Sequence, residues 1–157
     1  MLSNRLVRLI ETHANELALN LAEKVRASEQ LREYRKVLSY ELNARVYEIY
    51  HHLGDWLLER KEQDIEHHYR EIGGRRAAQG VPLSQLIRAI VLTKQNLWEF
   101  LKRESIVDNP VELFGQQELL EQLDQFFDSA IYYAAMGYEE MAKGHAQHQV
   151  VAAGKAS

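Results

Sequence analysis

The chain is predicted to reverse its direction sharply between Gln79 and Leu83. Gly80 suits the position just after a helix end and Pro82 suits the first turn of a new helix, so the connection needs only about four residues. Beyond Pro82, apolar residues recur at the helical period for roughly six turns. A stripe of that length must be covered, so this helix is predicted to be a core element. Its apolar residues are Leu83, Leu86, Ile87, Ile90, Val91, Leu97, Trp98 and Leu101.

The same periodicity along the rest of the chain predicts an all-α fold, a single-domain bundle of about five helices with a long C-terminal helix. Pro82 and Pro110 are the only prolines, and both fall where the period breaks. Gly73 and Gly74 lie inside a helical pattern, which predicts a close helix contact or a kink there. Helices are expected over residues 3–27, 40–60 and 62–79, from residue 82 onward, and over residues 116–143. The connection over residues 28–36 is expected to contain a short helix.

Length and composition limit the class of protein. A chain of 157 residues is long enough for one buried core, and we expect a helical sensor or interaction domain over residues 1–143 followed by a frayed tail over residues 144–157. The sequence has no cysteine, which fits a reducing cytoplasm. A net charge of -4 gives no electrostatic reason to bind nucleic acid or an anionic membrane. Charges interrupt the opening residues and every apolar run, so no leader peptide or membrane anchor is expected.

No catalytic signature is found in the sequence, and we expect neither an enzyme nor a bound cofactor. Nucleophilic catalysis lacks a cysteine or a serine in a glycine-rich elbow, and no phosphate-binding glycine loop occurs. Glu48 with His51, and Asp64 with His67, have the spacing of di-iron helices. Helical projection places these residues away from the apolar stripes, so solvated faces are favoured over a metal site.

Three basic residues do lie on apolar stripes: His13, Arg76 and Lys94. No carboxylate is expected at a comparable central position, and a buried cation without one is costly. The favoured interpretation is that the two long side chains carry their charges to the edge of the bundle while His13 is a satisfied core histidine. The alternative is a pocket for an anionic ligand, walled by Tyr69 and Trp98.

The region around the corner resembles a known family. Arg76, the run Gly80-Val81-Pro82-Leu83, the apolar helix after it and its Leu97-Trp98 end are similar to the N-terminal helical domain of RsbRD-type proteins, the RsbT co-antagonists. We extend the similarity over residues 2–141. The resemblance implies a bacterial input module that in relatives precedes a STAS output domain or a histidine kinase core, and it supplies no catalytic residues.

The expected function is therefore a non-catalytic signalling input or adaptor module in a stress-response or two-component pathway, acting in trans on a kinase or STAS-type regulator. The alternative is a small-molecule or haem-binding, globin-like sensor with His13 or His68 as the axial ligand. A homodimer is also expected, because the last helix offers more apolar surface than one bundle contact covers. The side chains behind that expectation are Phe126, Phe127, Tyr132, Tyr133 and Met141.

Overall fold

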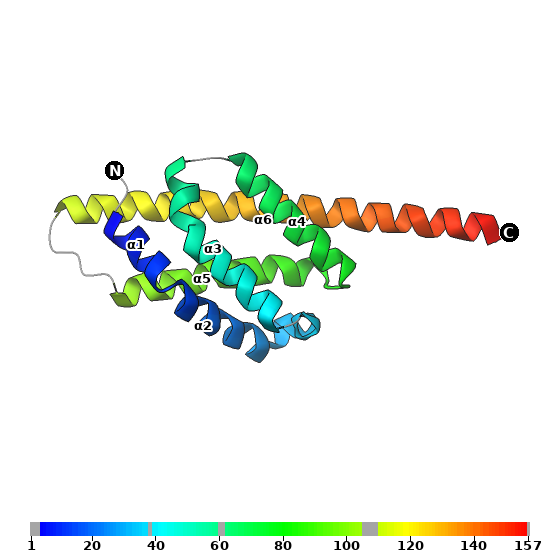
Figure 1. The fold of residues 1–157 in the computed structure, drawn as a ribbon, viewed down its shortest axis with the longest axis horizontal. Coiled ribbons are helices and arrows are strands. Elements are labelled where there is room, and N and C mark those ends of the chain that lie inside the picture. Colours follow the sequence, from blue (N-terminus) through cyan, green and yellow to red (C-terminus); the bar gives the residue numbers. More distant parts are fainter. Residues whose placement is uncertain (1–3, 38, 60–61, 105–109, 157) are drawn as a thin grey trace.

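The computed structural model describes residues 4–37, 39–59, 62–104 and 110–156, and this part of the chain contains helices and no strand. The predicted all-α class and long C-terminal helix are therefore confirmed. Figure 1 shows the longest helix running along the molecule, with the other helices gathered along its N-terminal part. The elements are α1 (Asn4–Thr12), α2 (Ala14–Ala27), a 3-10 helix η1 (Glu29–Lys36), α3 (Ser39–Glu59), α4 (Glu62–Ala78), α5 (Leu83–Glu104) and α6 (Pro110–Ala156).

Two of the predicted helices have different boundaries in the structure. The first predicted helix is divided at His13, whose ψ of 16° interrupts the helix between α1 and α2. Helix α6 has 47 residues and begins at Pro110, because proline is tolerated in the first turn of a helix. It also continues past Lys143, where a frayed tail was expected; the alanine-rich sequence there favours helix. The functional division into residues 1–143 and 144–157 stays a prediction.

The predicted reversal between α4 and α5 is confirmed in detail. Gly80 has a φ of +74°, the left-handed conformation that glycine adopts without strain. The Val81 N–H donates to the Arg76 carbonyl at 3.0 Å, and the Gly80 N–H donates to the Ala77 carbonyl at 3.1 Å. This pair of bonds is the Schellman arrangement, which satisfies the last carbonyls of α4. Helix α5 then starts directly after Pro82.

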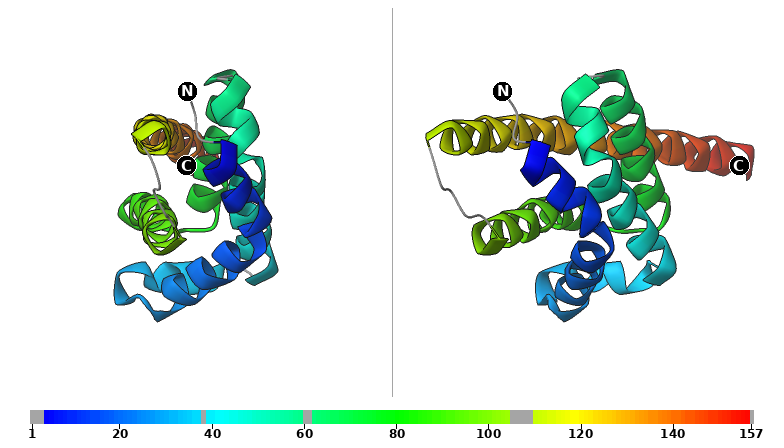
Figure 2. Two further views of the ribbon diagram at one scale, coloured as in Figure 1. Left: turned by 90° about the vertical axis from the view of Figure 1, so that its left-hand side faces the viewer. Right: turned by 60° about the vertical axis from the view of Figure 1, so that its left-hand side comes forward.

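Helices α4 and α5 both pack on α6, and the contact between α4 and α6 is the most extensive in the fold. Helices α1 and α2 pack on α3, and α2 also contacts α5; the two views in Figure 2 show η1 on the side of the molecule away from α6.

The core prediction for α5 is confirmed for Ile90, which is buried, while Ile87 is half-buried. Residues of α5 with buried side chains are Leu86, Ile90, Thr93, Asn96, Leu97, Phe100 and Leu101.

Glycines allow α4 and α6 to approach closely, as the Gly73-Gly74 pair predicted. A β-carbon on Gly73 would collide with the main-chain carbonyl of Ala134 on α6. A β-carbon on Gly137 would collide with the main chain of Arg70 on α4. We call this contact the glycine crossing, defined by Gly73, Ala134, Gly137 and Arg70. Each helix therefore requires a residue without a side chain where the other backbone passes.

The apolar surface of α6 is smaller than expected. Phe126 and Phe127 are buried within the chain, and Tyr133 is half-buried. Only Tyr132 and Met141, of the five side chains on which the homodimer expectation rested, are exposed. Within the described residues, no helix combines the length and the apolar character needed to cross a membrane.

Candidate functional site

Arg76 is buried at the end of α4, with 3% of its side chain exposed. Its Nη1 donates to Glu41 Oε1 at 3.2 Å and to Gln79 Oε1 at 2.9 Å. Gln79 Nε2 in turn donates to Glu41 Oε2 at 3.3 Å. The guanidinium carbon lies 5.6 Å from the centre of the Tyr34 ring. The expectation that no carboxylate stands beside this cation is therefore wrong, because Glu41 reaches it from α3.

Burial and the Arg76 charge shift the pKa values of Tyr34 and Glu41 in opposite directions. Burial raises the pKa of Tyr34 to about 12, although the Arg76 charge partly opposes it. Burial also acts to raise the pKa of Glu41, but the hydrogen bonds and charges of Arg76 and Arg75 outweigh it and hold that pKa below its usual value. Glu41 is therefore a carboxylate at neutral pH. Its ion pairs with Arg75 and Arg76 join α3 to α4, and the contact of Arg76 with the Tyr34 ring adds η1 to the cluster.

We expect Glu41→Gln to destabilise the fold at pH 7 by about 1–3 kcal/mol, because the Arg76 cation loses its charged partner. A carboxylate with a lowered pKa contributes stability above its unfolded pKa, and this stability is lost as the pH falls through the folded value. The difference between wild type and Glu41→Gln should therefore shrink below the usual pKa of 4.5. Urea unfolding of both proteins at a series of pH values measures this; a difference that stays constant down to pH values well below 4.5 would contradict it.

Lys94 is not a buried cation. Its side chain is 32% exposed, and its Nζ lies 2.9 Å from Asp124 Oδ1 on α6. The ammonium also lies 5.7 Å from the centre of the Trp98 ring. The interior anion site was predicted because basic groups on apolar stripes were expected to lack a carboxylate partner. Lys94 and Arg76 both have such a partner, so this argument no longer holds for either residue. The favoured interpretation, a long side chain that carries its charge to the bundle edge, agrees with the geometry of Lys94. It is wrong for Arg76, whose side chain is buried with its ion pair.

The remaining predicted residues lie in separate surroundings. His13 Nδ1 is 2.9 Å from the Leu9 carbonyl, and its ring packs against Phe100 at 5.4 Å. Tyr69 is buried beside Phe126, and its hydroxyl has no hydrogen-bond partner among the described residues. Binding of a ligand by these residues stays a prediction, and the structure does not gather them around one cavity.

His68, the second axial-ligand candidate, is enclosed by aromatic rings. Its ring centre lies 5.3 Å from that of Trp56 and 5.3 Å from that of Tyr69. Burial lowers the pKa of His68, so the neutral ring is favoured at neutral pH. Haem ligation by His68 or His13 stays a prediction.

The residues with di-iron spacing lie at the surface. His51, Asp64 and His67 are exposed, and Glu48 is half-buried next to Arg45. In the part of the chain that the structure describes, no group of three His, Cys, Asp or Glu side chains is placed to hold a metal ion.

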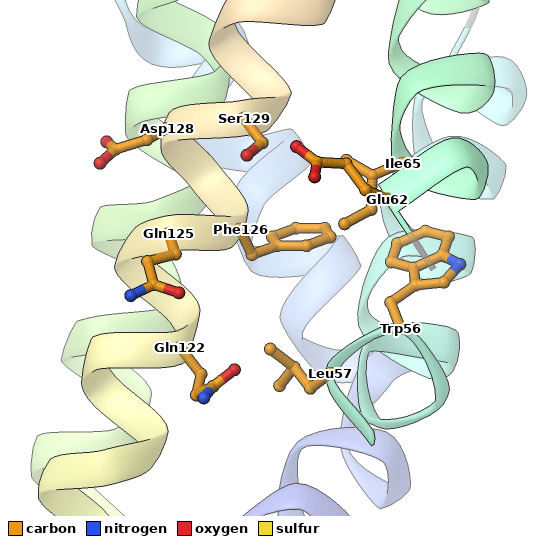
Figure 3. Close-up of a pocket in the computed structure, with 9 residues that line it drawn as sticks. All are labelled: Trp56, Leu57, Glu62, Ile65, Gln122, Gln125, Phe126, Asp128 and Ser129. Atoms are coloured by element: carbon orange, nitrogen blue, oxygen red, sulfur yellow. The ribbon is translucent and has the colours of Figure 1, made fainter. Parts of the chain in front are cut away.

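A pocket that the sequence analysis did not find lies where the end of α3 and the start of α4 face the middle of α6 (Figure 3). Its volume is about 460 Å³. Phe126 reaches from α6 toward Trp56, and the two rings are stacked with centres 5.5 Å apart and planes 18° apart. We call it the Trp56 pocket; it is lined by Trp56, Leu57, Glu62, Ile65, Gln122, Gln125, Phe126, Asp128 and Ser129.

The fold and these sites describe an all-helical domain that joins a compact bundle to an extended C-terminal helix. The family model of the RsbT co-antagonist protein rsbRD N-terminal domain matches residues 15–151. The chain therefore belongs to this family, as its sequence resemblance predicted. The comparisons with curated proteins and with solved structures find no match.

Proposed function

We propose that the chain is a non-catalytic signalling input domain, which transmits its state through α6 to a kinase or STAS-type regulator in a bacterial stress-response or two-component pathway in the cytoplasm. Membership of the family of RsbT co-antagonist N-terminal domains supports this proposal. The observation that carries it is the extent of α6. Its 47 residues span roughly 70 Å, and the same helix forms part of the bundle core and continues beyond it.

The contacts of α6 couple it to the rest of the bundle. At the glycine crossing its backbone touches that of α4, so a movement of one helix must displace the other. Beside the crossing, Arg70 forms an ion pair with Glu140. The Tyr138 hydroxyl donates to the Val81 carbonyl at 2.7 Å, which ties α6 to the turn between α4 and α5. A change of packing in α4 or in this turn would therefore reach α6 directly.

Site-specific photo-crosslinking in the source organism tests the proposal. A photoreactive phenylalanine derivative at position 143, an exposed site on α6, should crosslink to a kinase or a STAS-domain regulator. The matched control replaces Arg35, which is exposed on η1 on the other side of the molecule. Mass spectrometry identifies the crosslinked proteins. Identical partners from both positions, or none from position 143, would count against transmission through α6.

We also propose that the domain forms a homodimer through the face of α6 that carries Tyr132, whose side chain is 61% exposed. Sedimentation equilibrium should find a dimer for the wild type and a monomer for Tyr132→Lys, because the added charge would have to be buried in the interface. Gln95→Lys, at an exposed position on α5, makes a similar charge change and should leave the dimer intact. A wild type that remains monomeric at high micromolar concentration would refute this prediction.

A further inference from the structure

We propose that the Trp56 pocket binds a small organic cation, such as an alkylammonium or quaternary ammonium compound. The proposal goes beyond signal transmission through α6, because it assigns a ligand class to a site that the proposed function does not use. Its basis is the coincidence, in one cavity of about 460 Å³, of aromatic rings and acidic side chains.

The aromatic and apolar wall suits the methyl or methylene groups of such a ligand. Trp56 is half-buried and presents part of its indole to the cavity, next to Phe126, Leu57 and Ile65. Aromatic faces attract cations through the negative charge of their π-electrons, and tryptophan does so most strongly. Alkylammonium groups combine this positive charge with an apolar surface, so both properties of the wall would be used.

The charge of the lining selects a cation over an anion. Among the lining residues that the structure describes, the charged ones are Glu62 and Asp128, and both are acidic. Figure 3 shows the Glu62 carboxylate on the cavity side, above the Phe126 ring, while the Asp128 side chain points away from that ring. Glu62 is therefore the carboxylate placed to meet a bound cation, and Asp128 adds negative potential only from a distance.

A second contact holds the Glu62 carboxylate in position. The Tyr133 hydroxyl donates to Glu62 Oε1 at 3.0 Å, and this hydrogen bond raises the pKa of Tyr133. A carboxylate can accept several hydrogen bonds, so Glu62 keeps acceptor capacity for a ligand. Gln122, Gln125 and Ser129 add neutral polar groups to the lining, which suit a hydroxyl or carbonyl group on the same ligand.

The test measures binding of choline to the purified chain at constant ionic strength. Its control ligand is 3,3-dimethyl-1-butanol, which has the shape of choline without the charge. The sequence has two tryptophans, so Trp98→Phe leaves Trp56 as the only indole and its fluorescence reports on the pocket. We expect saturable binding of choline and binding of the neutral alcohol weaker by about tenfold or more.

Two substitutions locate the site. Glu62→Gln keeps a side-chain oxygen that can accept the Tyr133 hydrogen bond but removes the charge, and it should weaken choline binding by about tenfold. Because Glu62 is exposed, we expect this variant to fold normally. Glu121→Gln makes the same change at an exposed α6 position outside the lining and should leave affinity unchanged. Trp56→Leu, followed by calorimetry, should also weaken binding.

Absence of saturable choline binding would overturn the proposal, as would equal affinity for choline and the neutral alcohol. Equal effects of Glu62→Gln and Glu121→Gln would likewise overturn it, because they would show attraction to the overall charge and not to the pocket. None of these results depends on α6 contacting a partner, so the proposed function and the ligand class can fail separately.

Discussion

Replacing Arg76 with methionine is expected to lower the free energy of unfolding by about 3–5 kcal/mol, because it removes the buried cation of an ion pair and leaves Glu41 only its longer, more exposed contact with Arg75. The guanidinium is enclosed between Glu41, Gln79 and the Tyr34 ring. Methionine retains much of the apolar stem but none of the hydrogen bonds. Urea denaturation at neutral pH, monitored by circular dichroism, measures the loss.

The matched control is Lys94→Met, which removes the same charge from a basic side chain that also pairs with a carboxylate and lies near an aromatic ring. Because that pair is largely exposed, the change should alter stability by no more than about 1 kcal/mol. Similar losses for the two variants would show that burial of the Arg76 ion pair has no special weight. Such a result would also mean that the Lys94 side chain is less exposed in solution than in the structure.

Adding one methyl group at the glycine crossing should also destabilise the fold. Gly73→Ala and Gly137→Ala each place a β-carbon against the backbone of the facing helix, where no flexible side chain can yield. Alanine is favoured over glycine in a helix by about 1 kcal/mol, but forced separation of two packed helices typically costs about 1–3 kcal/mol. At both positions the added β-carbon would lie well inside van der Waals distance of a main-chain oxygen of the facing helix, so the upper part of this cost range applies. We expect a net loss of about 1–2 kcal/mol in thermal or urea unfolding.

Gly144→Ala provides the control on the same helix. A β-carbon at Gly144 meets no atom within 4 Å, so only the helix propensity changes. This variant should therefore be stabilised by up to about 1 kcal/mol. Stabilisation of all three alanine variants alike would mean that α4 and α6 are not in backbone contact in solution.

Local sequence rules predicted the elements whose geometry is set by neighbouring residues. Gly80 and Pro82 located the reversal because the left-handed conformation and the first helical turn are properties of single residues. The Gly73-Gly74 pair predicted a close helix contact or a kink, because glycine lacks a side chain, and the structure shows the close contact. None of these features identifies the partner helix.

The partners of the basic residues could not be predicted in this way. Glu41 and Asp124 lie off the apolar stripes of their own helices, so a projection of each helix alone places them in solvent. Asn96 was missed for a similar reason: it is buried because its amide donates to the Leu17 carbonyl at 3.1 Å and accepts from Lys24 Nζ at 2.7 Å. Such pairings depend on which helices are neighbours, and periodicity does not contain that information.

The Trp56 pocket was missed because it belongs to no single element. Its residues come from the end of α3, the start of α4 and the middle of α6. More than 50 residues of the chain separate Ile65 on α4 from Gln122 on α6. Each residue alone is an ordinary surface or stripe residue. Only the packing of three helices brings Trp56, Glu62 and Phe126 together.

The part of helix α6 beyond the glycine crossing is a long lever on the bundle. From Gly137 to Ala156 it is about 28 Å long at the helical rise. A tilt of about 5° at the glycine crossing would move the far end by roughly 2.5 Å, which exceeds the rise of one helical residue. A small repacking of α4 is thus magnified with distance, and a binding partner on the lever would experience a displacement large enough to change which of its side chains are in contact.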